Sequence, residues 1–178
     1  MNKLLALAAA SALSIGLAAP ALAALPVGAA APTFKSTVAM AGKDTSFDLA
    51  AALKKGPVVL YFFPAAFTAG CTAEAHEFAE ATDDFNKAGA TIVGMTMGNT
   101  DRIAEFSKLE CRDKFAVGAA SAEVVKAYDA ANATRPGMTG RISYVINKGG
   151  KIAYVHNDPN FAGHVSGALE SVKTLAAK

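Results

Sequence analysis

Cysteine and histidine are scarce in this sequence of 178 residues. The two cysteines, Cys71 and Cys111, stand far apart, and neither belongs to a Cys-x-x-Cys pair. The three histidines, His76, His156 and His164, are scattered and show no His-x-x-x-His spacing. Zinc and copper sites need several such ligands at close spacing, so the sequence predicts that the chain holds no metal.

Net charge is also nearly absent. The chain has 17 lysines and arginines against 15 aspartates and glutamates, with no block of like charge and no internal repeat. A near-neutral surface gives no electrostatic basis for binding nucleic acid or an anionic membrane. The same balance permits association between copies without requiring it, and we expect a monomer or a weak dimer.

Long apolar runs are confined to the beginning of the chain. Lys3 gives a short positive start, Leu4–Ala19 is rich in alanine and leucine, and an Ala-Leu-Ala cleavage signal ends at Ala23. We expect a secretory signal peptide over 1–23 and a single domain over 24–178, located in the periplasm or secreted. A transmembrane anchor is the alternative, but the run is shorter than the roughly 20 strongly apolar residues that a span needs.

The stretch from Pro57 to Glu74 organises the rest of the chain. It begins with an unbroken apolar and aromatic run, Pro57–Phe63, which is typical of a strand buried on both faces. Pro64 ends this strand because proline cannot donate to a ladder, and a short loop and a helix follow. Cys71 lies at the start of that helix, where the helix dipole favours a thiolate over a thiol. A buried, structural cysteine is the alternative interpretation.

Strand and helix patterns alternate through the remaining chain. Two β-hairpins are expected, over 33–38 with 45–49 and over 141–146 with 151–156, the second joined across an Asn-Lys-Gly-Gly turn. The other expected elements are a short helix capped by Asp48, strands over 91–97 and 115–117, and helices over 102–109, 121–131 and 163–177. This order predicts an α/β fold: a mixed sheet flanked by helices, with an N-terminal β-hairpin.

The residues around Cys71 resemble the active site of the peroxiredoxins. That family carries the pattern Pro-x-x-x-Thr-x-x-Cys, and Pro64, Thr68 and Cys71 stand at these intervals. With Gly70 and Glu74, the segment is most similar to the peroxiredoxin Q branch, also called bacterioferritin comigratory proteins. The resemblance implies a thioredoxin-like fold and a cofactor-free thiol peroxidase. Its substrates would be hydrogen peroxide or organic hydroperoxides, and its reductant an external, thioredoxin-like thiol protein.

Two catalytic residues follow from the resemblance. Cys71 would attack the peroxide and become a sulfenic acid. Arg141 opens the pattern Arg-x-Ser-Tyr-Val-Ile, which is similar to the family's Arg-x-Thr-Phe-x-Ile. Its guanidinium would hold the thiolate and the peroxide oxygens with fixed donors. The alternatives are a solvated arginine at a strand end, and Arg135 in place of Arg141.

Thr68 is expected to be a third catalytic residue, whose hydroxyl would form a hydrogen bond with the peroxide; the alternative is an ordinary turn hydroxyl. Pro64, Gly70 and Glu74 are expected to line the substrate pocket. Pro64 and Gly70 would give the pocket its shape. Glu74 would either orient an arginine or be a first-turn carboxylate that the helix dipole favours.

Cys111 follows the predicted helix over 102–109. The resemblance implies that its thiol condenses with the Cys71 sulfenic acid to form a disulfide. Many members of the branch place this resolving cysteine five residues after the first, where this chain has His76, for which we expect a solvated surface position. The family's Ser-Asp after the next strand is replaced by Ala119-Ala120-Ser121, so this chain departs from the pattern in the middle.

Two other functions stay open. One is a thioredoxin-like disulfide exchange protein, against which the absence of Cys-x-x-Cys counts. The other is a non-catalytic thioredoxin-like module with a static bridge between Cys71 and Cys111. The presence of Thr68 and Arg141 counts against the second, because a static bridge needs neither residue.

Overall fold

The centre of the sheet is β3 (Val58–Phe62), a strand in which every residue is buried. In the computed structural model, which describes residues 24–177, β3 pairs in parallel with β4 (Thr91–Thr96) and antiparallel with β6 (Ile142–Ile146). Over these residues the sheet has seven strands, in the order β2 (Lys43–Asp48), β1 (Lys35–Met40), β5 (Ala116–Ala119), β4, β3, β6 and β7 (Ile152–Asn157). The predicted mixed α/β sheet is confirmed.

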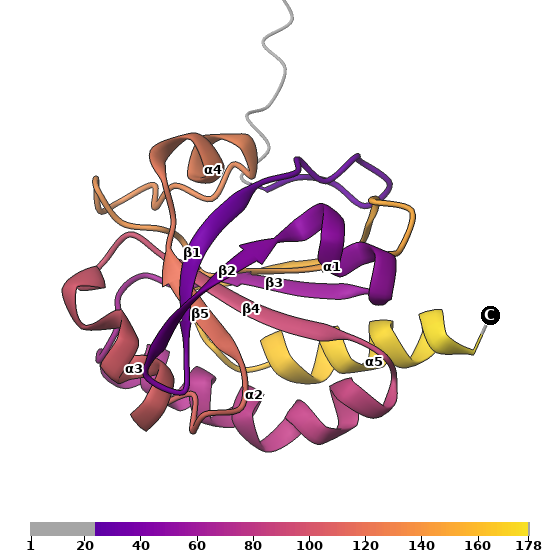
Figure 1. The fold of residues 1–178 in the computed structure, drawn as a ribbon. Coiled ribbons are helices and arrows are strands. Elements are labelled where there is room, and N and C mark those ends of the chain that lie inside the picture. The colour runs from indigo at the N-terminus through magenta and orange to yellow at the C-terminus, as the bar shows by residue number, and fades with distance from the viewer. Residues whose placement is uncertain (1–23, 178) are drawn as a thin grey trace, which may run out of the picture.

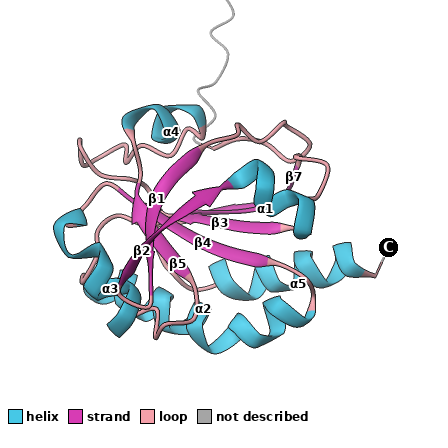
Figure 2. Ribbon diagram, viewed as in Figure 1, coloured by secondary structure: helices cyan, strands magenta, loops and turns pink. Residues whose placement is uncertain are grey.

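Helices cover both faces of the sheet (Figure 2). They are α1 (Leu49–Lys55), α2 (Ala69–Lys87), α3 (Ile103–Leu109) with a preceding 3-10 turn (Thr100–Arg102), α4 (Ala122–Ala127) and α5 (His164–Ala176). Alternate residues of β3 point to opposite faces. Val59 and Tyr61 pack with α2, α3 and α5, whereas Leu60 and Phe62 pack with α1 and α4. On the first face α2 and α5 lie side by side (Figure 1).

Both predicted hairpins are present, with β1 paired to β2 and β6 paired to β7. The first hairpin is part of the main sheet, because β1 also pairs with β5. The strand predicted over 115–117 spans Ala116–Ala119. The helix predicted to reach residue 131 ends at Ala127, because Asp129 has a left-handed φ of 50° that an α-helix cannot include.

The predicted signal peptide and its cleavage site lie outside the described residues. The segment just after them is held against the start of β7 and the turn that precedes it. The amide of Gly28 donates to the Ile152 carbonyl at 2.8 Å, and that of Ala31 donates to the Gly150 carbonyl at 2.8 Å. Within residues 24–177 no helix has both the length and the apolar character needed to cross a bilayer.

Candidate active site

Cys71 lies in the first turn of α2, directly after the loop that follows β3. Phe67 has a φ of 59°, which turns the chain sharply between strand and helix. Thr68 is the N-cap residue, but its side chain caps no amide; its hydroxyl donates to the Ala65 carbonyl at 3.1 Å. The Cys71 side chain is 1% exposed. The loop therefore places a buried sulfur at the N-terminus of a helix of 19 residues, where the helix dipole stabilises negative charge.

Three side chains from neighbouring segments hold this loop in place. The Thr96 hydroxyl at the end of β4 donates to the Pro64 carbonyl at 3.1 Å, and Asn99 donates to the Ala66 carbonyl at 2.9 Å. The hydroxyl of Thr139 donates to the Phe63 carbonyl at 2.5 Å. Each bond satisfies a backbone carbonyl that has left the strand ladder. These bonds therefore fix the backbone of the loop that leads from β3 to Cys71.

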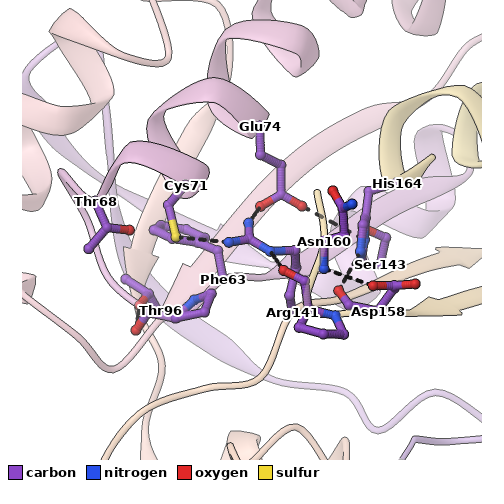
Figure 3. Close-up of polar contacts among 12 residues, drawn as sticks. Phe63, Thr68, Cys71, Glu74, Thr96, Arg141, Ser143, Asp158, Asn160 and His164 are labelled. Atoms are coloured by element: carbon purple, nitrogen blue, oxygen red, sulfur yellow. Dashed lines mark hydrogen bonds and ion pairs between the residues drawn. The ribbon is translucent and has the colours of Figure 1, made fainter. Parts of the chain in front are cut away.

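Arg141 lies next to the end of β3, because Ile142 pairs with Phe62 in the antiparallel register. It is 8% exposed, so it is not a solvated arginine at a strand end, whereas Arg135 is exposed in its loop. Its Nη2 donates to Cys71 Sγ at 3.5 Å (Figure 3). Its other nitrogens are also engaged, because Nη1 donates to the Glu74 carboxylate and Nε donates to the Pro159 carbonyl at 3.0 Å. The guanidinium is thus held beside the sulfur from three directions.

Glu74 lies one turn after Cys71 on α2 and is fully buried. Its carboxylate forms an ion pair with Arg141, which is the first of the two roles considered for it from the sequence. Burial raises the pKa of Glu74 to about 8, and the charge and hydrogen bond of Arg141 act in the opposite direction. The carboxyl group therefore takes up or loses a proton close to neutral pH, directly behind the arginine that contacts Cys71.

Gly70 is required by how closely Arg141 approaches the loop. A Cβ at this position would lie 3.3 Å from Arg141 Nη2 and 4.0 Å from Phe161. Pro64 is half-buried and Thr68 is exposed at the surface above Cys71. The structure thus brings Gly70, Cys71, Glu74 and Arg141 together, with Thr68 beside Cys71 (Figure 3). Pro64 lies in the same loop, between β3 and Cys71.

Sequence reasoning missed two residues behind Arg141. Ser143 Oγ lies 2.8 Å from His164 Nδ1, and both side chains are fully buried. His156 and His164, which the sequence shows as too scattered to form a metal site with each other, nevertheless lie together, with ring centroids 4.4 Å apart. The chain after β7 turns back at once into α5, which brings the two rings into contact. Spacing could have shown that His164 faces inward, because Ala168 and Val172 follow it at intervals of four residues and are also buried.

The second cysteine lies apart from this cluster. Cys111 is fully buried in the same apolar core as Cys71, and the described residues contain both as free thiols. Burial, and then the charge of Glu110, raise the pKa of the Cys111 thiol well above its usual value. In this state Cys111 is therefore a protonated, unreactive thiol.

His76 occupies a different environment from the solvated one expected. Its Nε2 lies 2.7 Å from the Glu110 carboxylate, and the side chain is 34% exposed. The expectation was wrong because it considered α2 alone, and the end of α3 packs against this part of α2 in the fold. The pair links the helix that carries Cys71 to the residue just before Cys111.

Metal-ligating residues do not gather in the described part of the chain. Among residues 24–177 no group of three or more histidine, cysteine, aspartate and glutamate side chains could hold a metal ion. What the site offers chemically is a sulfur at a helix N-terminus, a fixed guanidinium, a hydroxyl at the opening and a carboxyl group that titrates near neutral pH.

Comparison with known proteins identifies the family. The family described as "AhpC/TSA family" matches residues 27–155, which is most of the chain. The chain belongs to this family. It is 31% identical over 105 residues to a putative chloroplastic peroxiredoxin Q of Oryza sativa subsp. indica, covering 59% of this chain and 48% of that protein. It is 26% identical over 132 residues to peroxiredoxin Bcp of Escherichia coli K12, covering 67% of this chain and 80% of that protein.

A solved peroxiredoxin structure agrees with the fold. The crystal structure of peroxidoxin BcpB from Mycobacterium tuberculosis has a TM-score of 0.74 and 25% identity, covering 84% of this chain and 97% of that chain. These matches confirm the resemblance to the peroxiredoxin Q and Bcp branch, and with it the thioredoxin-like fold. The chain spans about half the length of the plant peroxiredoxin Q proteins that it matches.

Proposed function

We propose that this chain is a thiol-dependent peroxidase that reduces hydrogen peroxide or organic hydroperoxides through Cys71. The observation that carries the proposal is the contact of Arg141 Nη2 with Cys71 Sγ, made by a buried guanidinium that Glu74 holds in place. A fixed cation and a helix N-terminus both stabilise a thiolate, which is the form that attacks a peroxide. No cofactor is needed, because the electrons come from the sulfur.

The proposed first step moves negative charge from sulfur to oxygen. The Cys71 thiolate attacks one peroxide oxygen, a sulfur–oxygen bond forms, and the O–O bond breaks. The electron pair of the O–O bond leaves on the other oxygen as alkoxide or hydroxide, which takes a proton from water. The attacked oxygen keeps its hydrogen, so the Cys71 product is a sulfenic acid. Arg141 lies close enough to stabilise both the attacking and the departing charge. The first amides of a helix have no partner within it, and they add donors at the same point.

The other site residues orient the peroxide in this proposal. The Thr68 hydroxyl already donates its proton to the Ala65 carbonyl, so its oxygen is left to accept a hydrogen bond from the peroxide. Pro64 shields the sulfur from water, and the missing side chain of Gly70 leaves room for Arg141. Glu74 acts through Arg141 by fixing the plane of the guanidinium.

We also propose that Cys111 resolves the sulfenic acid. Its sulfur would attack Cys71 Sγ, form the disulfide and release the sulfenic oxygen as water. Cys111 is buried in this state, so the end of α3 and the first turn of α2 must unwind, as helix ends do at low cost. Arg112 and Asp113 support this proposal, because both have left-handed backbone conformations directly after Cys111, with φ of 50° and 60°. An external thiol protein would then reduce the disulfide.

The experiment adds one equivalent of peroxide to the reduced protein and follows residual peroxide together with non-reducing peptide maps. We expect the peroxide to disappear and a Cys71–Cys111 peptide to form within one chain. Unchanged peroxide would contradict the proposed activity. Cys71 sulfinic acid with Cys111 still alkylatable would show that an outside thiol resolves the intermediate, and a bridge between two chains would show a dimeric cycle.

The partners in this proposal are small or transient. We propose a peroxide as substrate, a thioredoxin-like thiol protein as reductant, and no nucleic acid or membrane. Among the described residues the large hydrophobic side chains that are exposed are Val27, Met40 and Leu109, which do not suggest an extensive interface. This agrees with a monomer or weak dimer.

We propose that the protein is exported to the periplasm or secreted, and that its mature form begins near Ala24. The basis is the apolar run and the Ala-Leu-Ala signal before that residue. Expression of the full chain in a bacterial host, followed by fractionation and intact-mass measurement, tests this. We expect periplasmic protein that lacks residues 1–23. Cytosolic protein of full mass would contradict it.

A further inference from the structure

Glu74 and His164 form a buried acid–base pair behind Arg141. Figure 3 shows Arg141 between Cys71 on one side and this pair on the other. Both side chains are fully buried, and Glu74 Oε1 lies 3.7 Å from His164 Nδ1. The other carboxylate oxygen, Oε2, receives Arg141, but Oε1 has no hydrogen-bond partner among residues 24–177. A buried carboxylate oxygen without a donor favours uptake of a proton.

The contacts of His164 determine where its own proton lies. Its Nε2 is 3.0 Å from the Asp158 carbonyl, which can only accept, so Nε2 carries the hydrogen. Its Nδ1 is 2.8 Å from Ser143 Oγ and accepts from that hydroxyl while the ring is neutral. Nδ1 has a single lone pair, so it accepts either from Ser143 or from a proton on Glu74 Oε1, not from both at once. Nδ1 and Oε1, 3.7 Å apart, can therefore hold one further proton between them, on either atom.

The surroundings favour placing that proton on the carboxyl group. Burial raises the pKa of Glu74 to about 8, against the effect of Arg141, and the nearby Glu77 raises it further. Burial lowers the pKa of His164 to about 4. The Asp158 carbonyl raises it, whereas the charges of His156 and Arg141 lower it. The titratable and charged groups that face the pair are Arg141, Glu77, His156 and Asp158. Tyr61 also faces it, because the charge of Glu74 raises the pKa of Tyr61.

We propose that His164 is a positioning residue that controls the charge Arg141 presents to Cys71, by sharing one proton with Glu74. The inference takes Cys71 as the reacting thiol, as the proposed function does. When the pair holds the proton it is neutral, and the full charge of Arg141 acts on the sulfur. When the proton is lost, the Glu74 carboxylate offsets that charge and the thiolate is less stable. By reciprocity, loss of the Cys71 proton to solvent favours uptake of a proton from solvent by the pair.

The variant His164→Asn tests this. An asparagine amide in the place of Nδ1 donates to Glu74 Oε1 and holds the carboxylate in its charged form. We expect the midpoint of Cys71 alkylation against pH to rise by about one unit, the lower end of the shift that a charge within roughly 4–6 Å causes. The measurement uses the full protein with Cys111→Ser, so that alkylation reports on Cys71 alone. An unchanged midpoint in a folded variant would overturn the proposal.

A double-mutant cycle separates this role from a general structural one. Glu74→Gln mimics the protonated carboxyl group, so we expect a midpoint no higher than that of the unmodified protein. In that background His164→Asn should have no further effect, because His164 acts through Glu74. The same rise with and without Glu74→Gln would contradict the proposal. His76→Asn is the matched control, because it removes the other histidine–glutamate pair on α2 and should leave the Cys71 midpoint unchanged.

Ser143→Ala provides a second test that does not depend on the folding of His164→Asn. Without the hydroxyl, the Nδ1 lone pair is free to accept from protonated Glu74, the pair holds its proton more tightly, and the Cys71 midpoint should fall. A rise or no change would overturn the proposal. Alkylation needs no peroxide, so the outcomes are independent of the enzyme assay. A protein that shows these shifts yet consumes no peroxide would refute the proposed function and leave this inference standing.

Discussion

Replacing Cys71 by serine is expected to reduce peroxide consumption to the rate of buffer alone. A serine hydroxyl is not ionised near neutral pH, even at a helix N-terminus beside Arg141, and it cannot form a sulfenic acid. The substitution is close in volume, and Arg141 Nη2, which contacts the sulfur, can donate to the serine oxygen, so the fold should be retained. Peroxide consumption with an excess of dithiol reductant measures the effect, and circular dichroism checks the fold.

Cys111→Ser is the matched control, since it removes the other buried thiol of the same core. This variant should still reduce one equivalent of peroxide per chain and should lose the internal disulfide. Continued turnover in Cys71→Ser would contradict the assignment of the reacting sulfur. Loss of the first step in Cys111→Ser would show that the two cysteines do not have separate roles.

Replacing Arg141 by alanine is expected to slow the peroxide step by about 10²–10³-fold, the usual effect of removing one preorganised donor. The guanidinium contacts Cys71 Sγ directly, so its loss also raises the pH midpoint of Cys71 alkylation. Glu74 then remains buried without its partner and should take up a proton rather than unfold the site. Stopped-flow rates at several pH values, with alkylation profiles of the same samples, measure both effects.

Arg135→Ala is the control for this substitution, because Arg135 is exposed in a loop and was the competing candidate from the sequence. It should leave the rate and the Cys71 midpoint unchanged. If Arg135→Ala slowed the reaction and Arg141→Ala did not, the roles of the two arginines would be reversed.

The parts of the site that sequence reasoning recovered depend on local patterns. The apolar run before Pro64 predicted a buried strand, and the helical spacing after Cys71 predicted the helix, because each pattern lies within one element. The position of Cys71 in the first turn follows from where these two patterns meet. Arg141 could be named only through the resemblance to peroxiredoxins, since its contact with Cys71 depends on β6 pairing beside β3.

The parts that it missed depend on contacts between elements. His164 and Ser143 meet because α5 packs behind β6, and no spacing within either element shows that contact. His76 lies on the polar side of α2 in a helical projection, yet the end of α3 brings Glu110 against it. Contacts between titratable groups on different elements can therefore be seen only in the structure. The contact between Glu74 and His164 is the one that makes this site respond to pH.

The most direct test of the account is a single-turnover reaction of the reduced Cys111→Ser protein with one equivalent of hydrogen peroxide. Peroxide loss is followed by stopped flow, and the product is identified by mass spectrometry after a sulfenic-acid trap is added. The account predicts that peroxide disappears in step with the Cys71 thiol and that Cys71 alone carries one added oxygen atom. Peroxide that persists while Cys71 remains a free thiol would contradict it.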